Sequence, residues 1–206
     1  PTRRSSDLIN THSKIYCKIL AARVANANKQ FKLIGTEQTG FIAGKICLNT
    51  VSSVIEVIEN RRIAGLDTWP CFIDFRKAYD LVSHKQLFSK MELKGLGPKF
   101  INSITNLYKG TKLCARVDNV ISEQFPYDRG VRQGCPTSPL LFDICIDDLS
   151  DKMDGITVPN YHKRIKSFKF ADDSLLLGES IEDITEKMQQ LEEWTRLNYM
   201  EVNVSK

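Results

Sequence analysis

Three aspartates occupy positions where carboxylates could do chemistry. Asp172 and Asp173 stand side by side in the stretch FADDSLLL, between two apolar runs that predict the strands of a hairpin. Aspartate is common in turns, so the pair alone settles nothing. The context gives it weight, because two adjacent carboxylates between apolar strands are costly unless they are paired. A divalent metal ion is one partner that neutralises them.

Asp74 supplies a third carboxylate, near the end of the apolar stretch 69–75, which predicts a buried strand. A strand-end charge that faces solvent is the ordinary alternative. If this strand lies beside the hairpin, Asp74, Asp172 and Asp173 converge and could hold two Mg²⁺ ions about 3.5–4 Å apart, as in-line phosphoryl transfer requires. One ion would lower the pKa of an attacking hydroxyl, and the other would neutralise a leaving pyrophosphate.

The elements that must position these aspartates alternate between helix and strand. Apolar residues at helical spacing predict helices at 13–28, from 48 to near Gly65, and at 81–93, 98–108, 138–149 and 181–197. Short apolar runs predict the strand at 69–75 and hairpins at 112–125 and 165–177. Ser180 with Asp183 is typical of a capped helix start. Helices mixed with hairpins indicate an α+β fold with an antiparallel sheet, built as subdomains of one unit.

Composition narrows the class without deciding the function. The 206 residues are 42% hydrophobic and 26% charged, which excludes disordered and fibrous classes, and the net charge of +4 permits a nucleic-acid partner without requiring one. The six cysteines form no CxxC pair, so we expect reduced thiols rather than a zinc site or a disulfide framework. No apolar run approaches the roughly 18 residues that span a bilayer, and we expect no membrane partner.

The first residues, PTRRSSD, differ in kind from the rest. They match the in-frame translation of a common sequencing adapter, so we expect residues 1–7 to be non-native and exclude them from fold reasoning. A genomic sequence that encodes PTRRSSD upstream of Leu8 would contradict this expectation.

Three stretches resemble, in order and spacing, successive polymerase motifs of reverse transcriptases. They are FIDFRKAYD (72–80), RGVRQGCPTSPLLF (129–142) and FADD (170–173). The branch found in non-LTR (LINE-like) retrotransposons matches best, because EQTGF (37–41) and a tail with Trp194 and NVSK (203–206) also resemble its pattern. The resemblance covers about residues 8–206. Any one motif is weakly specific, whereas several in order are highly specific.

This resemblance implies a right-hand polymerase palm, an antiparallel sheet backed by helices, with partial fingers. It assigns 8–66 and 111–130 mostly to the fingers, assigns 67–110 and 131–206 to the palm, and leaves the thumb absent. The implied activity is that of an RNA-directed DNA polymerase core, which adds deoxynucleotides to a primer 3′ end on an RNA template by two-metal phosphoryl transfer. Without a thumb to hold primer and template, we expect the fragment alone to be inactive or poorly processive.

The resemblance also implies roles for individual residues. By position, Asp74, Asp172 and Asp173 match the catalytic, metal-binding carboxylates. The positions that match nucleotide-binding residues are Phe75, Tyr79, Gln133, Gly134 and Lys206.

Tyr79 matches an aromatic gate that would clash with a ribonucleotide 2′-hydroxyl. Without the motif, we would interpret Tyr79 as a packed aromatic residue at the start of a helix. Gln133 offers a donor and an acceptor, and Gly134 permits close approach of the backbone. Lys206 matches a lysine that assists pyrophosphate departure, and its alternative is a solvated lysine.

The implied partners are an RNA template, a DNA primer and deoxynucleoside triphosphates, with two Mg²⁺ ions as cofactors. The implied location is intracellular, and nuclear at the site of integration. One alternative is a decayed or co-opted copy that only binds nucleic acid, which would fit departures such as Phe170 for Tyr, Thr137 for Leu and Asp143 for Asn. Another is a group II intron or retron reverse transcriptase. The complete reading frame would discriminate among them.

Overall fold

A three-stranded antiparallel sheet lies at the centre of the molecule, in the strand order β1-β7-β6. The computed structural model describes residues 11–118 and 120–204, and of Arg116 the backbone alone. The strands are β1 (Trp69–Ile73), β6 (Ser167–Phe170) and β7 (Asp173–Gly178). The strand predicted at 69–75 therefore pairs directly with the predicted hairpin. The expected α+β fold with an antiparallel sheet is confirmed.

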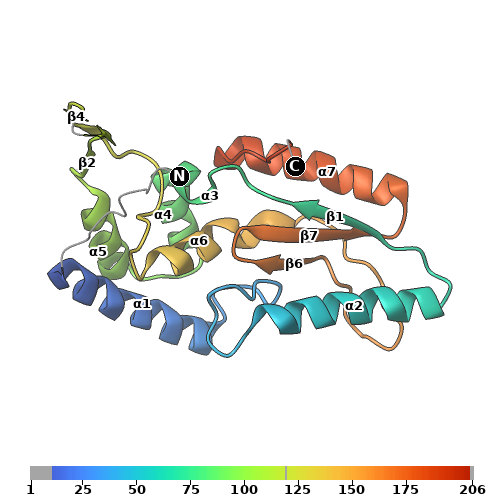
Figure 1. Ribbon diagram of the computed structural model, residues 1–206. Coiled ribbons are helices and arrows are strands. Elements are labelled where there is room, and N and C mark those ends of the chain that lie inside the picture. Colours follow the sequence, from blue (N-terminus) through green and yellow to red (C-terminus); the bar gives the residue numbers. More distant parts are fainter. Residues whose placement is uncertain (1–10, 119, 205–206) are drawn as a thin grey trace.

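Two long helices cover opposite faces of the sheet (Figure 1). They are α2 (Cys47–Ile63) and α7 (Ile181–Asn198). Val57 of α2 belongs to a buried cluster with Leu175, whereas Leu191 of α7 shares the main core with Leu176. Successive strand residues point to opposite faces, so a central strand between two helical layers must be apolar on both sides. The continuous Leu run of β7 meets that requirement.

The remaining helices build the core at one end of the sheet. They are α1 (Thr11–Phe31), α3 (Ala78–Leu81), α4 (His84–Leu93), α5 (Pro98–Tyr108) and α6 (Ser138–Ile146), with a 3₁₀ turn, η1 (Asp147–Ser150). Every residue of α6 except Pro139 is buried. A helix that is apolar on all sides is stable only when other elements surround it, and α1 and α4 both contact it.

The structure corrects one predicted helix. The segment 81–93 is not continuous, because α3 ends at Leu81 and α4 begins at His84. Between them, Ser83 forms a bridge with Arg129, and the carbonyl of Val82 accepts a hydrogen bond from the Gly130 amide at 2.8 Å. Pairing with the loop before α6 therefore interrupts the helical pattern. The helix predicted at 138–149 also becomes 3₁₀ after residue 146.

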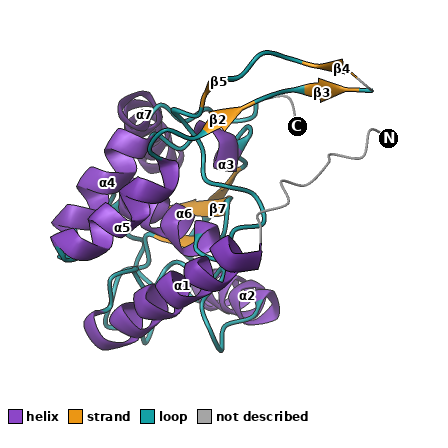
Figure 2. Ribbon diagram, turned by 90° about the vertical axis from the view of Figure 1, so that its left-hand side faces the viewer, coloured by secondary structure: helices purple, strands orange, loops and turns teal. Residues whose placement is uncertain are grey.

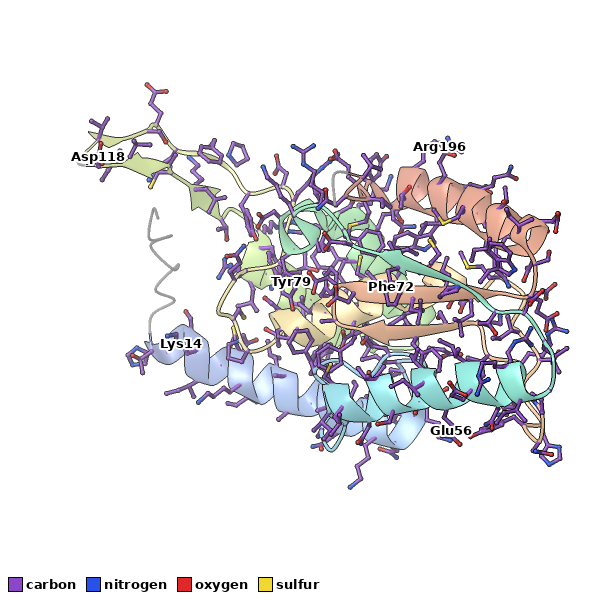
Figure 3. The ribbon with its side chains drawn as sticks, turned by 45° about the vertical axis from the view of Figure 1, so that its right-hand side comes forward. Lys14, Glu56, Phe72, Tyr79, Asp118 and Arg196 are labelled. Carbon is purple, nitrogen blue, oxygen red and sulfur yellow. The ribbon has the colours of Figure 1, made fainter. Side chains whose placement is uncertain are left out.

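The predicted hairpin at 112–125 is confirmed as two short ladders in succession. Strand β2 (Lys112–Leu113) pairs with β5 (Phe125–Pro126), and β3 (Arg116–Val117) pairs with β4 (Val120–Ile121). The hairpin projects from the helical body (Figure 2), with Asp118 near its tip (Figure 3).

Smaller predictions also have outcomes in the structure. Ser180 caps α7, since its side chain accepts a hydrogen bond from the Asp183 amide, as predicted. All six cysteines lie in the described ranges and are free thiols. Within those ranges, no helix combines the length and the apolar character needed to cross a membrane.

Candidate active site

Asp172 and Asp173 lie at the tight turn between β6 and β7. Phe170 pairs with Asp173, so Ala171 and Asp172 form a two-residue turn. Ala171 is buried and has a φ of 56°, a left-handed conformation that favours glycine. Asp172 is half-buried, and Asp173, the first residue of β7, is exposed. The hairpin thus presents two carboxylates from one strained bend.

Asp74 comes directly after β1, at the same end of the sheet. The register pairs Ile73 with Ser174, so one further step sets Asp74 opposite Asp173. The Asp74 Oδ2 atom accepts a hydrogen bond from the Asn203 side-chain amide at 2.9 Å. The Asp74 carbonyl also accepts one from the Asn203 amide at 2.8 Å. Asp74 is therefore held from both its backbone and its side chain.

The predicted site residues divide between two adjoining pockets. A pocket of about 630 Å³ is lined by Phe75, Tyr79, Gln133, Gly134 and Asp172, among others. A pocket of about 710 Å³, between α2 and the sheet, is lined by Asp74, Asp173, Asn203 and apolar side chains such as Phe72. Figure 3 shows Phe72 on β1, and Tyr79 near the end of the sheet that carries the turn between β6 and β7. Asp172 belongs to the turn and Asp173 begins β7, and their side chains line different pockets.

Tyr79 forms a fixed wall of the first pocket. Its ring stacks on Phe142, with centroids 4.8 Å apart and planes 11° from parallel. Burial raises the pKa of the Tyr79 phenol, and the negative charges of Asp143 and Asp172 raise it further. The phenol therefore stays protonated and its ring has little freedom to turn.

The loop that carries Gln133 and Gly134 forms the opposite wall. The Val131 amide donates to the Tyr79 carbonyl at 2.8 Å, which fastens the loop to α3. Gln133 Nε2 donates to Asp80 Oδ1 at 3.1 Å. Gly134 has a φ of 77° and open space where a side chain would begin. Two motifs that lie about fifty residues apart thereby face each other across one pocket.

Sequence comparison identifies the family to which the chain belongs. The profile described as reverse transcriptase (RNA-dependent DNA polymerase) matches residues 3–206. The chain belongs to the reverse transcriptase family.

Named relatives place this reverse transcriptase domain among proteins of mobile elements. The transposon TX1 uncharacterized 149 kDa protein of Xenopus laevis is 23% identical over 207 residues, covering 98% of this chain and 16% of that protein. The Pol polyprotein from the type-1 retrotransposable element R2 of Popillia japonica is 32% identical over 158 residues, covering 72% of this chain and 25% of that protein. The predicted resemblance to non-LTR retrotransposons is confirmed, and the chain spans a quarter or less of these relatives.

The fold has relatives among solved structures. Telomerase from Candida tropicalis, solved with a fragment of telomeric RNA, matches 95% of this chain and 33% of its own, with a TM-score of 0.65 and 12% identity. A likeness at that identity concerns the fold, and it agrees with the expected palm of a polymerase.

The donor set of this reverse transcriptase domain suits a divalent ion. Carboxylate oxygens are the ligands that Mg²⁺ prefers, and Asp74, Asp172 and Asp173 stand at adjoining strand ends with their side chains partly or fully exposed. Across residues 11–118 and 120–204, however, no three His, Cys, Asp or Glu side chains are close enough to hold one ion together.

Lys206 and residues 1–7 lie outside the described residues. The role expected for Lys206 and the non-native origin expected for 1–7 therefore remain predictions.

Sequence reasoning missed residues that support the aspartates from behind. Asn203 stood in the quoted tail without a role, and Gln38 stood in EQTGF without one. Gln38 is fully buried and hydrogen-bonds the backbone of Ala171. The motifs marked both residues, but only the fold shows what they contact.

Asp143 is an unusual buried carboxyl behind Tyr79. Its side chain is fully buried, and in the described part of the chain neither of its oxygens has a hydrogen-bond partner. Burial, and then the charge of Asp147, raises the pKa of Asp143 to about 8. The group is therefore largely protonated, and so uncharged, at neutral pH.

Proposed function

We propose that this domain is the RNA-directed DNA polymerase core of a non-LTR retrotransposon protein. The observation that supports this most strongly is one pocket that joins Asp172 to Tyr79, Gln133 and Gly134, residues from three separate motifs. Asp74 lines the adjoining pocket, opposite Asp173 in the register. The proposed reaction adds a deoxynucleotide to a primer 3′ end on an RNA template.

Asp74, Asp172 and Asp173 would hold two Mg²⁺ ions in this proposal. When bound, the ions supply activation of the primer hydroxyl and neutralisation of the leaving pyrophosphate. The contribution of the chain is to keep carboxylate oxygens at two adjoining strand ends. Asn203 fixes the orientation of Asp74 through its side-chain amide.

The first pocket has the features of a deoxynucleotide site. The Tyr79 ring, stacked on Phe142, presents a rigid surface that would overlap a ribose 2′-hydroxyl. Gln133 offers both donor and acceptor atoms to the incoming nucleotide, and Gly134 leaves room for its approach. Phe75 is buried beneath this pocket and contacts Trp194 of α7, with ring centroids 6.1 Å apart.

The partners and division of the chain follow from the same proposal. The template is RNA, the primer is DNA, and the protein would act in the nucleus at the site of integration. Residues 8–66 and 111–130 would belong mostly to the fingers, and 67–110 and 131–206 to the palm. Lys206 would assist the departure of pyrophosphate.

The test is Asp172→Asn in the complete reading frame that encodes this chain. Loss of a metal ligand removes several kcal/mol of transition-state stabilisation, so we expect primer extension on RNA to fall by about 10³-fold or more. Asp154→Asn is the matched control, because Asp154 is an exposed aspartate outside both pockets. Extension that is unchanged in Asp172→Asn would refute the metal assignment. A wild-type protein that binds RNA without extending a primer would favour the binding-only remnant.

A further inference from the structure

Gln38 contacts the turn of the aspartate hairpin from behind. Its side-chain amide donates from Nε2 to the Ala171 carbonyl at 3.2 Å and accepts at Oε1 from the Ala171 amide at 3.1 Å. The same Oε1 accepts from the Gly40 amide at 2.8 Å. Gln38 is 0% exposed, so water does not compete for these bonds. We call the paired contact between the Gln38 side chain and the Ala171 backbone the Gln38 bridge.

The segment around Gln38 lies against the hairpin as a short extra strand. Gln38 forms a parallel bridge with Lys169 of β6. The Lys169 amide donates to the Glu37 carbonyl at 2.9 Å, and the Thr39 amide donates to the Lys169 carbonyl at 2.9 Å. A Cβ atom at Gly40 would lie 2.2 Å from the Ala171 nitrogen, so only glycine permits this approach. Figure 1 shows the loop between α1 and α2 reaching the end of the β6–β7 hairpin.

The palm core holds this loop in place. The Gly35 amide donates to Asp147 Oδ1 at 2.7 Å, and Lys94 forms an ion pair with the same carboxylate. Lys94 also donates to the Leu33 carbonyl at 2.6 Å, and buried Lys169 donates to the Asp147 carbonyl at 2.6 Å. Its anchors lie directly after α4, in β6 and in η1, and these contacts hold the loop against the turn.

The turn needs such support because of Ala171. An L-residue with a Cβ adopts a φ of 56° only at an energetic cost that glycine avoids. A turn strained in this way keeps its shape when the surrounding structure fixes it. The Gln38 bridge satisfies both backbone groups of Ala171, immediately before Asp172 and Asp173.

We propose that Gln38 is a positioning residue, which fixes the Ala171 turn and thereby the direction of the Asp172 and Asp173 carboxylates. This inference rests on the proposed function, in which those carboxylates hold metal ions. Gln38 touches neither nucleotide nor metal, and it acts through Ala171.

The first experiment measures the turn without metal. Gln38→Leu in the complete reading frame leaves the buried Ala171 amide without its acceptor. Hydrogen exchange of peptides that cover 168–176, in metal-free protein, should become on the order of tenfold faster. The matched control is Gln86→Leu, because the Gln86 amide also donates to a backbone carbonyl, that of Leu197, at 3.1 Å and outside the site. Its exchange at 168–176 should equal that of wild type.

The second experiment measures the consequence for metal use. Single-turnover primer extension over a range of Mg²⁺ concentrations should show that Gln38→Leu raises the half-maximal concentration and lowers the rate by on the order of 10²-fold. Gln86→Leu should change neither. A merely structural role would lower the fraction of active molecules, seen as a smaller amplitude of the single-turnover reaction. It would leave the Mg²⁺ dependence unchanged.

Two further variants keep the test decisive if Gln38→Leu folds poorly. Gln38→Glu retains the acceptor for Ala171 and, with its carboxyl protonated as burial favours, a donor as well, so its effect should be smaller. Ala171→Gly in the Gln38→Leu background relieves the strain at φ 56°, so it should restore several-fold of the lost rate.

The outcomes separate this inference from the function beneath it. Loss of extension in Asp172→Asn together with wild-type exchange and Mg²⁺ dependence in Gln38→Leu would overturn the role of Gln38 alone. Absence of primer extension in the wild-type protein would overturn the proposed function itself, and retained extension in Asp172→Asn would overturn the metal assignment. Faster exchange together with a raised Mg²⁺ requirement, partly reversed by Ala171→Gly, would establish Gln38 as a positioning residue.

Discussion

The two supports for the aspartates are built differently. Asp74 ends a strand whose direction is set by pairing with β7, and its partner Asn203 belongs to the segment that runs back alongside it. Asp172 and Asp173 follow the strained residue Ala171, whose backbone is hydrogen-bonded by the Gln38 side chain. The first support is local to the sheet, whereas the second depends on the loop between α1 and α2. The sheet alone therefore does not hold all three carboxylates.

This difference predicts that the two supports fail differently. Damage to the Asp74 support removes one hydrogen bond to a carboxylate that the sheet still places. Damage to the Gln38 bridge releases the backbone strain at Ala171, and the carboxylates of Asp172 and Asp173 then both change position. We therefore expect substitutions around Ala171 to reduce activity more than substitutions around Asp74.

Gly40→Ala should have the largest effect. The added Cβ would lie 2.2 Å from the Ala171 nitrogen, a backbone atom, so the loop and the turn must separate. We expect a loss of about 3 kcal/mol in the free energy of unfolding. A turn displaced by about 1 Å should cost about 10²-fold in the rate of primer extension. Chemical denaturation and single-turnover extension measure the two effects.

A control separates the clash from a general effect of replacing glycine. Gly97→Ala is suitable, because Gly97 has no neighbour within 4 Å of the added atom and its backbone has no positive φ. It should leave the extension rate near that of wild type. Equal losses in both variants would contradict the close approach at Gly40.

Asn203→Ala should have a smaller effect. It removes the side-chain donor to Asp74 Oδ2 while the backbone hydrogen bond between these residues remains. A hydrogen bond to a charged group contributes about 1.5–3 kcal/mol, so we expect a loss of about tenfold to 10²-fold in extension rate. Asn106→Ala, on the exposed side of α5, is the control. A loss larger than that of Gly40→Ala would reverse the proposed order of the two supports.

Much of this site was predictable from local sequence. The short apolar runs at 69–75 and 165–177 predicted strands, and the motifs marked Asp74, Asp172 and Asp173. The break at Val82 and Ser83 was missed, because it comes from pairing with Arg129 and Gly130 rather than from a local signal.

The supports themselves were less predictable, for a physical reason. Gln38 lies in a loop between Gly35 and Gly40. The loop has no helical or strand periodicity, so nothing in the local sequence reveals the partner of Gln38. The Gln38 bridge joins two residues that are far apart in the sequence and come together only in the fold. Motif resemblance marked the loop, and the contact that explains it required the fold.

Asp143→Asn should separate stability from positioning, because Asp143 belongs to neither support. Its folded pKa is raised to about 8, from an ordinary value of 3.8, by burial and then by the charge of Asp147. Between these two pH values the folded state binds more protons than the unfolded state, so stability falls as pH rises. The slope is about 1.4 kcal/mol per pH unit at most, and it vanishes above about pH 8. The neutral amide removes this slope.

Denaturation of wild type and Asp143→Asn from pH 5 to pH 9 measures the difference. The free energy of unfolding of the variant should gain on that of wild type as pH rises towards 8 and then stay parallel to it. The Mg²⁺ concentration for half-maximal extension should not change, because the turn and the Asp74 support are intact. Parallel stability curves from pH 5 to pH 8 would show that Asp143 is ionised in the folded protein. A changed Mg²⁺ requirement would show instead that the wall behind Tyr79 helps to place the carboxylates, and the division into two supports would then be incomplete.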